Sequence, residues 1–155
     1  MSDVSTSAGA IIYIGAAAPS AFDKAGYEAV TWTEVGEVSN IDGDLGKVFS
    51  LSTFNLLKEA GVVKRKGSYN NGSITVQYGY HRTDTGQAAV VAAAGIQTTL
   101  PFKIALGDQE TTQIYFMALT MGDPINIGGS DDFITSTVTL EIDSESDVLK
   151  EVAPV

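Results

Sequence analysis

The sequence contains no cysteine and one histidine, His81. The lack of cysteine excludes disulfides, zinc–thiolate sites and thiol nucleophiles. One histidine cannot build a histidine-based metal cluster, and His81 has no serine nearby in a recognisable turn, so no catalytic triad is indicated. Phosphate-binding glycine loops, dinucleotide fingerprints and nucleophile elbows are missing as well. The sequence therefore predicts a protein that is not an enzyme, with no catalytic residues, no metal and no cofactor.

Basic residues are also scarce. Nine Lys and Arg against nineteen Asp and Glu give a formal charge of −10, which argues against a surface that grips the phosphates of nucleic acid. The charged fraction is 18%, so the chain needs a good core or partners that cover its faces. The apolar run from Ala10 to Ala21 is shorter than the roughly 20 residues that span a bilayer. We therefore expect no membrane insertion by this chain.

A chain of 155 residues fits one domain, 1–155. Its sixteen glycines and frequent Thr, Val and Ile predict a mainly β fold. Residues 1–9 are small and polar, which indicates a flexible N-terminal arm. Residues 144–155 form an acidic, then apolar C-terminal tail.

Short β-branched runs and alternation of apolar with polar side chains predict the strands. The Asn71-Gly72 pair predicts a tight hairpin turn between two of them. The run from Ile114 to Leu119 is apolar on both faces, so we expect its own core on one side and a neighbour on the other, in a chain stable chiefly as an oligomer. The predicted strands are Ala10 to Ile14, Tyr27 to Val38, Val62 to Ser68, Ile74 to Tyr80, Thr98 to Leu106, Thr112 to Met121 and Ile134 to Asp143.

The residues between Asp84 and Gly95 predict one short helix. Asp84 can cap its start with Gln87 three residues later, and Gly95 suits the position just past its end. The run between them, Gln87 to Ala94, is almost entirely small. We expect this helix to cover one flank of the sheet, because its small side chains allow the helix backbone to approach the sheet closely.

A long connection separates two of the predicted strands. Asn40 to Gly61 contains Gly43 and Gly46 as breakers, and compact domains rarely keep so long a loop without a purpose. The sequence therefore predicts that this loop, residues 40–61, reaches something outside the domain.

The order of these segments resembles the tail tube (major tail) proteins of long-tailed, siphovirus-type bacteriophages. The resemblance covers roughly Ile11 to Asp143 and rests on the strand Thr31 to Val38, the long loop, the strand Val63 to Ser68, the Ala-rich helix and the final strand Ser136 to Asp143. It consists of strand patterns in a given order and spacing, with no single chemical signature.

The resemblance implies a β-sandwich or half-barrel flanked by one helix. Six copies would close into a hexameric ring with a continuous inner β-barrel, and rings would stack into the hollow tube that conducts DNA to the host cell. The implied partners are further copies of the chain, a tape-measure protein and tail tip or terminator proteins, while DNA passes through without specific binding. The implied location is the phage tail of the virion, with the host cytoplasm during assembly.

Two sets of candidate residues follow from this resemblance. The long loop would bridge rings, and an acidic channel would keep DNA off its wall at a range of about 8 to 10 Å in physiological salt. The candidate inter-ring residues are Asp42, Asp44, Leu45, Lys47, Phe49, Phe54 and Leu57. The candidate lumen-facing acids are Glu34, Glu37, Asp108, Glu110, Glu141 and Asp143.

Two other functions fit the same sequence. A related tube of a contractile injection or secretion system could use the same fold. A monomeric carbohydrate-binding or small hydrolytic β-domain would need a concave site with convergent carboxylates or aromatics. The six tyrosines and one tryptophan do not cluster in a way that suggests such a site.

Overall fold

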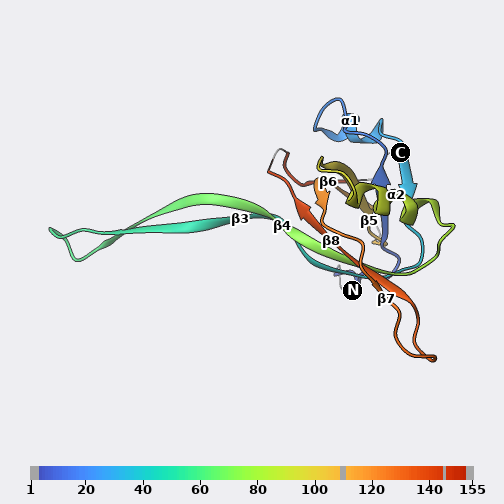
Figure 1. Ribbon diagram of the computed structural model, residues 1–155. Coiled ribbons are helices and arrows are strands. Elements are labelled where there is room, and N and C mark those ends of the chain that lie inside the picture. Colours follow the sequence, from blue (N-terminus) through green and yellow to red (C-terminus); the bar gives the residue numbers. More distant parts are fainter. Residues whose placement is uncertain (1–3, 109–110, 145, 153–155) are drawn as a thin grey trace.

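The computed structural model describes residues 4–108, 111–144 and 146–152. Within them the chain forms a single antiparallel sheet with two helices (Figure 1). The strands are β1 (Ile11–Gly15), β2 (Trp32–Glu34), β3 (Val38–Asn55), β4 (Val62–Gly79), β5 (Leu100–Ala105), β6 (Thr112–Thr120), β7 (Ile125–Asn126), β8 (Thr135–Ile142) and β9 (Leu149–Val152). The helices are α1 (Lys24–Glu28) and α2 (Thr85–Ala94). The predicted mainly β fold is confirmed.

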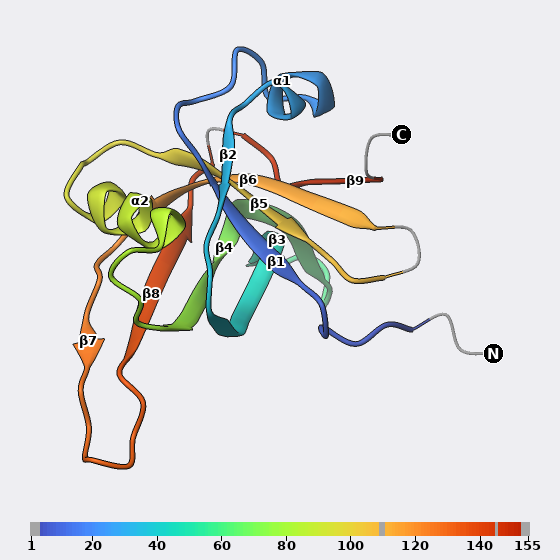
Figure 2. The same cartoon turned by 90° about the vertical axis from the view of Figure 1, so that its right-hand side faces the viewer.

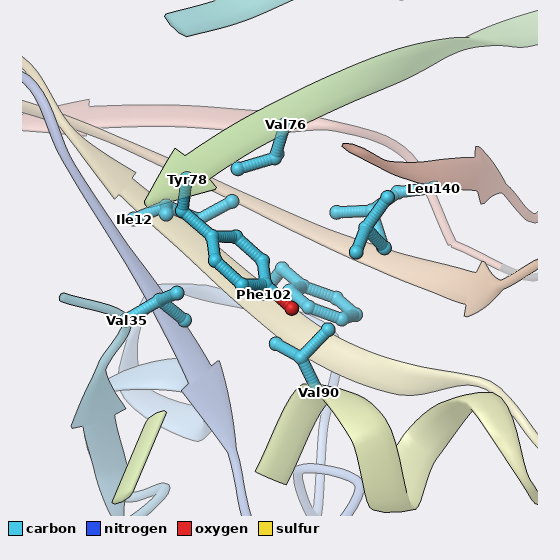
Figure 3. Close-up of a pocket in the computed structure, with 8 residues that line it drawn as sticks. Ile12, Val35, Val76, Tyr78, Val90, Phe102 and Leu140 are labelled. Carbon is cyan, nitrogen blue, oxygen red and sulfur yellow. The ribbon is translucent and has the colours of Figure 1, made fainter. Parts of the chain in front are cut away.

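The sheet curls around one apolar core. Its strand order is β2-β1-β5-β6-β8-β4-β3, with β7 beside β8 and β9 beside β6. Ile12 and Phe102 come from one half of this order, and Val76 and Leu140 come from the other half. All four nevertheless line the same enclosed space, about 10 Å³ in volume, together with Val90 of α2 (Figure 3). The two halves must therefore face each other, as in the expected half-barrel, and the space between them is filled by side chains.

Helix α2 closes a flank of this curl (Figure 2). The Asp84 carboxylate accepts a hydrogen bond of 2.9 Å from the backbone N–H of Gln87, and Gly95 follows the last helical residue. Val90 and Ala93 are each 4% exposed and face the core. The predicted caps and the predicted position of the helix are confirmed.

A second helix, α1, was not predicted, and it changes how β6 is covered. The sequence predicts a strand over residues 27–38, but the chain forms α1 first and keeps only a short β2. Tyr27 of α1 is fully buried and stacks on Tyr115 of β6, with ring centroids 5.1 Å apart. Trp32 packs beside them and donates a hydrogen bond of 2.9 Å to the Tyr27 carbonyl. The second apolar face of β6 is thus covered from within the chain, and the prediction that a neighbour covers it is wrong.

The predicted long loop is also wrong. β3 and β4 have 18 residues each and pair from Val38 opposite Tyr78 to Asn55 opposite Val62, so residues 40–55 belong to a strand. Asn71 and Gly72 lie inside β4, where a turn was predicted. Glycines with positive φ mark irregular pairing here, since the register shifts between Leu45 and Val48. A bulge and a turn both use such glycines, so their presence alone did not distinguish the two.

The remaining strands mostly follow the predicted alternation. β5 and β6 pair as an antiparallel hairpin. In β8, Ser136, Val138, Leu140 and Ile142 are buried while Thr137 and Glu141 are exposed. Part of the predicted C-terminal tail forms β9, which pairs with β6.

Several smaller expectations have mixed outcomes. Residues 4–9 of the predicted N-terminal arm are exposed, and residues 1–3 lie outside the described part. Met117 of β6 is buried in the core, whereas Met121, just after β6, is 60% exposed. Neither helix of the described chain is long and apolar enough to cross a membrane.

The start of α2 is fixed by the Gln87 side chain, which is 3% exposed. Its amide nitrogen donates to the carbonyls of Gly36 and Gly79, and its oxygen accepts from the backbone N–H of His81, each at 2.9 Å. One side chain therefore satisfies three backbone groups from two segments, one at Gly36 and one at Gly79 to His81.

We expect Gln87→Ala to lower the free energy of unfolding by about 2 to 4 kcal/mol, because it leaves these backbone groups without partners. Urea denaturation measures the change. The control is Gln97→Ala, an exposed glutamine, for which the change should stay within about 0.5 kcal/mol. Equal effects of the two substitutions would contradict the assigned role.

Candidate functional site

The described residues contain no group of three His, Asp or Glu side chains able to hold a metal ion. The enclosed cavity in the core, about 10 Å³, is too small for a ligand. Larger hollows are open to solvent, such as one of about 550 Å³ lined in part by Tyr69, Asn71 and Glu141, so the candidate features considered next are surfaces. Two of them stand out: a projecting hairpin and a polar face of the sheet.

The outer part of the β3–β4 hairpin, residues 47–69, is called the hairpin arm here. It projects far from the body of the molecule (Figure 1). A strand rises about 3.3 Å per residue, so the ten steps from Leu45 to Asn55 reach about 33 Å. Its large apolar side chains are exposed: Val48, Phe49, Leu51, Phe54, Leu56, Leu57, Val62 and Tyr69. Monomeric proteins rarely expose so much contiguous apolar surface, which indicates a binding surface.

The hairpin arm also differs in charge from the rest of the chain. Residues 47–69 contain five basic residues and one acid, a net charge of +4, which leaves four basic residues and eighteen acids, a net charge of −14, elsewhere. Lys64, Arg65 and Lys66 alternate between the two faces of the arm, as predicted for a strand. Within the described residues the ion pair that forms joins Lys47 to Asp147.

One face of the arm is ordered by contacts between aromatic rings and lysines. The rings of Phe49 and Tyr69 lie 5.4 Å apart. The Nζ atom of Lys66 lies 4.8 Å from the centre of the Phe49 ring, and that of Lys47 lies 4.7 Å from the centre of the Tyr69 ring. Such contacts stabilise exposed strands by roughly 0.5 to 1 kcal/mol each.

The root of the arm is tied to the C-terminal segment through Asn71. This side chain is 1% exposed, and its amide nitrogen donates to the carbonyls of Asp143 at 3.0 Å and Ser146 at 3.2 Å. The Ser146 hydroxyl in turn lies 3.2 Å from the hydroxyl of Tyr27. The Lys47–Asp147 ion pair of 3.0 Å adds a second tie at the surface. The direction of the arm is therefore set by contacts to residues far away in the sequence.

The polar face is the side of β3, β4 and β8 that points away from the core. Ser73 of β4 is paired with Asp44 on one side and with Glu141 on the other, so these three residues lie abreast. Strands are spaced about 4.8 Å apart, which places the two acids about 10 Å from each other. No Lys or Arg occurs in residues 38–45, 72–79 or 135–142. The polar face consists of Asn40, Asp42, Asp44, Ser73, Thr75, Gln77, Thr137, Thr139 and Glu141.

The predicted lumen acids do not form one group. Glu34 and Glu37 are exposed around the connection from β2 to β3, and Asp143 is half-buried just after β8. Glu110 lies outside the described residues. Glu141 lies on the polar face together with Asp42 and Asp44, which were predicted as inter-ring residues and not as lumen acids.

Asp108 has a structural role in the turn between β5 and β6. Its carboxylate accepts hydrogen bonds from the Thr112 hydroxyl at 2.7 Å and the Thr112 backbone N–H at 2.8 Å. These bonds hold the pKa of Asp108 below its usual value.

The predicted inter-ring residues divide between two places. Asp42, Asp44 and Leu45 lie where β3 is still part of the body. The others belong to the hairpin arm: Lys47, Phe49 and Phe54 on β3 and Leu57 in the turn. Asp42 and Asp44 were missed as members of the polar face because the loop assignment hid their spacing of two. The signal that could have found them is the alternation of Asn40, Asp42 and Asp44.

No protein-family model matches the sequence, and no curated protein sequence matches it. Solved structures do match. A chain of the PVC sheath–tube complex, an extracellular contractile injection system in its extended state, aligns with a TM-score of 0.64 and 14% identity over 93% of this chain and 88% of that chain. The SPP1 tail tube aligns with a TM-score of 0.61 and 14% identity over 94% of this chain and 78% of that one. The protein has the tail tube fold.

The tail tube fold covers the hairpin arm as well as the body. A chain from the tail of an empty GTA particle, solved with C6 symmetry, aligns over 97% of this chain and 100% of that chain, with a TM-score of 0.63 and 8% identity. The fold expected from the sequence resemblance is thereby confirmed.

We expect Asn71→Ala to loosen the root of the arm. The substitution removes two buried hydrogen bonds, so the free energy of unfolding should fall by about 1 to 3 kcal/mol. Hydrogen exchange should speed up at the amides of residues 146–152, which depend on this tie. Asn40→Ala is the matched control, because Asn40 is an exposed asparagine of the same hairpin. Unchanged exchange in residues 146–152 would show that Asn71 does not hold this segment.

Proposed function

We propose that this protein is the structural subunit of a phage tail tube, in which hexameric rings stack into a hollow conduit for DNA. The observation that carries the proposal is the tail tube fold over almost the whole chain, hairpin arm included. The six-fold symmetry of the GTA tail supports the number of copies in a ring. Further copies of the chain are then its main partners, with a tape-measure protein and tip or terminator proteins at the tube ends.

Open sheet edges support assembly into rings. β2 and β3 are the two ends of the strand order, so each has one edge with no strand beside it in the described chain. Exposed edges of this kind invite pairing with another chain. A closed ring of copies would pair edges between neighbours and join their sheets into the continuous inner barrel.

The polar face has the chemistry of a channel wall for DNA. It carries hydroxyl and amide side chains, three acids and no basic residue. Duplex DNA carries one negative charge per roughly 1.7 Å of its axis, so a basic wall would bind it and an acidic wall repels it. We assign this face to the lumen, with Asp42, Asp44 and Glu141 as its acids.

A tube of a contractile injection system is the second candidate function. The matches to the PVC sheath–tube complex and to the anti-feeding prophage baseplate favour it. Such a tube would lie inside a sheath and would not need to conduct DNA. The location also differs, because the first candidate belongs in the tail of a virion and in the host cytoplasm during assembly.

The experiment that tests the proposal is electron microscopy of the purified protein over a range of concentrations, with light scattering on the same samples. We expect six-fold rings and stacked tubes, and a mass that rises with concentration. Small particles of monomer mass at every concentration, also after addition of preformed tail tips, would contradict it. Tubes that carry DNA in purified particles distinguish the phage tail from the injection system.

We expect the triple change Asp42→Lys, Asp44→Lys and Glu141→Lys to leave tubes that assemble and retain DNA. Retention should fall steeply with salt, because each phosphate contact adds about one ion to the salt dependence. Filter binding of a DNA duplex across a salt series measures it. The matched control changes Glu28, Glu34 and Glu37 to Lys, which are equally exposed. If the control tubes retain DNA and the triple variant does not, the lumen lies on the other side of the subunit.

A further inference from the structure

A second protrusion extends from the lower side of the body in Figure 1, in a different direction from the hairpin arm, which points left. It comprises residues 121–134, which include β7, and is called the β7 loop here; Figure 2 shows it extending beyond the end of β8. Its large apolar side chains are exposed: Met121, Ile125, Ile127, Phe133 and Ile134. Phe133 is 89% exposed, which is unusual for a side chain of this size.

The β7 loop has a fixed shape. The Asp132 carboxylate accepts a hydrogen bond of 2.9 Å from the Gly129 N–H, and the Asp132 N–H donates to the Gly129 carbonyl at 3.1 Å. The Ser136 hydroxyl donates to the Pro124 carbonyl at 2.8 Å, and the Ile134 carbonyl accepts from Tyr80 at 2.9 Å. A binding surface that is already ordered loses little entropy when a partner binds.

The two protrusions have opposite charges. The β7 loop contains three acids, Asp123, Asp131 and Asp132, and no basic residue, while the hairpin arm has a net charge of +4. Contact between two arms, or between two β7 loops, would bring like charges together. Contact between an arm and a β7 loop would join opposite charges and cover apolar side chains on both.

We propose that the hairpin arm of one copy docks on the β7 loop of a second copy. The apolar tip, with Phe54 and Leu57, would pack against Ile127 and Phe133, while the lysines of the arm face the acids of the loop. The two surfaces differ, so the contact is heterologous, and each copy can use one surface toward the copy before it and the other toward the copy after it. The inference rests on the proposed function, because this contact would join successive rings of the tube.

The lack of cysteine allows a direct test by cross-linking. The double variant Leu57→Cys and Phe133→Cys is treated with a short bis-maleimide under assembly conditions. We expect a ladder of covalent multimers, because each copy offers both surfaces. A mixture of the two single variants should stop at dimers.

The control for geometry is Leu57→Cys combined with Val91→Cys, an exposed residue on α2. This pair should give no ladder. A ladder from the control alone, or equal ladders from both pairs, would overturn the proposal. Dimers from Leu57→Cys alone would indicate contact between arms and would overturn it as well.

Charge exchange tests the same contact without cysteine. Lys58→Glu with Lys64→Glu should reduce tube length at least tenfold, and so should Asp123→Lys with Asp131→Lys. Asp132 is kept, because it orders the loop. All four changes together should restore tubes. Thermal unfolding of each variant identifies any loss of folding, and the cross-linking result, which keeps the native charges, does not depend on these variants.

The outcomes separate the two proposals. Wild-type tubes without the expected ladder and without rescue by charge exchange would overturn the docking contact and leave the tube function standing. Absence of any wild-type ring or tube would overturn both. If the arm variants assemble normally but lose retention of a DNA duplex that the wild type binds, the partner of the arm is nucleic acid and the docking contact is wrong.

Discussion

The length of the β3–β4 hairpin is the constraint on which the rest of the structure depends. Inside the body, β4 has β8 as its second neighbour and alternates between buried and polar positions, as Ile74, Val76 and Tyr78 show. The pairing with β8 begins at Ser73, so beyond this point the hairpin has no third strand. A two-stranded hairpin is marginally stable in water by itself. The arm therefore needs contacts of its own, and in the structure it has a tether at its root and lysine–ring contacts along its first part.

The root of the hairpin arm shows that the same residue pair can occur in a tight turn or inside a strand. Asn71 and Gly72 have the residue types of a tight turn, and Gly72 does adopt a positive φ of 98°. The glycine is needed because a Cβ here would lie 2.2 Å from the Asp44 carbonyl oxygen. The asparagine is needed because the carbonyls of Asp143, which is half-buried, and Ser146, which is buried, both accept from its amide nitrogen. Both needs arise from contacts with distant residues, which the sequence pattern around Asn71 does not contain.

Elements with a strong periodic pattern or clear caps could be predicted from the sequence. β8 alternates over its whole length, and α2 has Asp84 at one end and Gly95 at the other. The sequence signal fails for short elements such as α1, whose five residues cannot show a helical period, and for β9, which exists through its pairing with β6. The candidate acids were predicted from the net charge and from the polar faces of the second and last predicted strands, and neither shows which face points inward. Only the register, in which Ser73 lies between Asp44 and Glu141, shows which acids share a surface.

The few basic residues are unevenly distributed along the chain. The net charge of −10, taken for the whole chain, is typical of a protein that does not bind DNA. The charge is nevertheless divided between a cationic hairpin arm and an acidic body. Identical subunits of uniform negative charge would repel one another, whereas subunits with one basic projection can attract the next copy at that point. Salt limits this attraction to about 8 Å under physiological conditions. The charges therefore select which surfaces meet, and the apolar side chains at the tip, such as Leu57 at full exposure, supply most of the binding free energy once they are in contact.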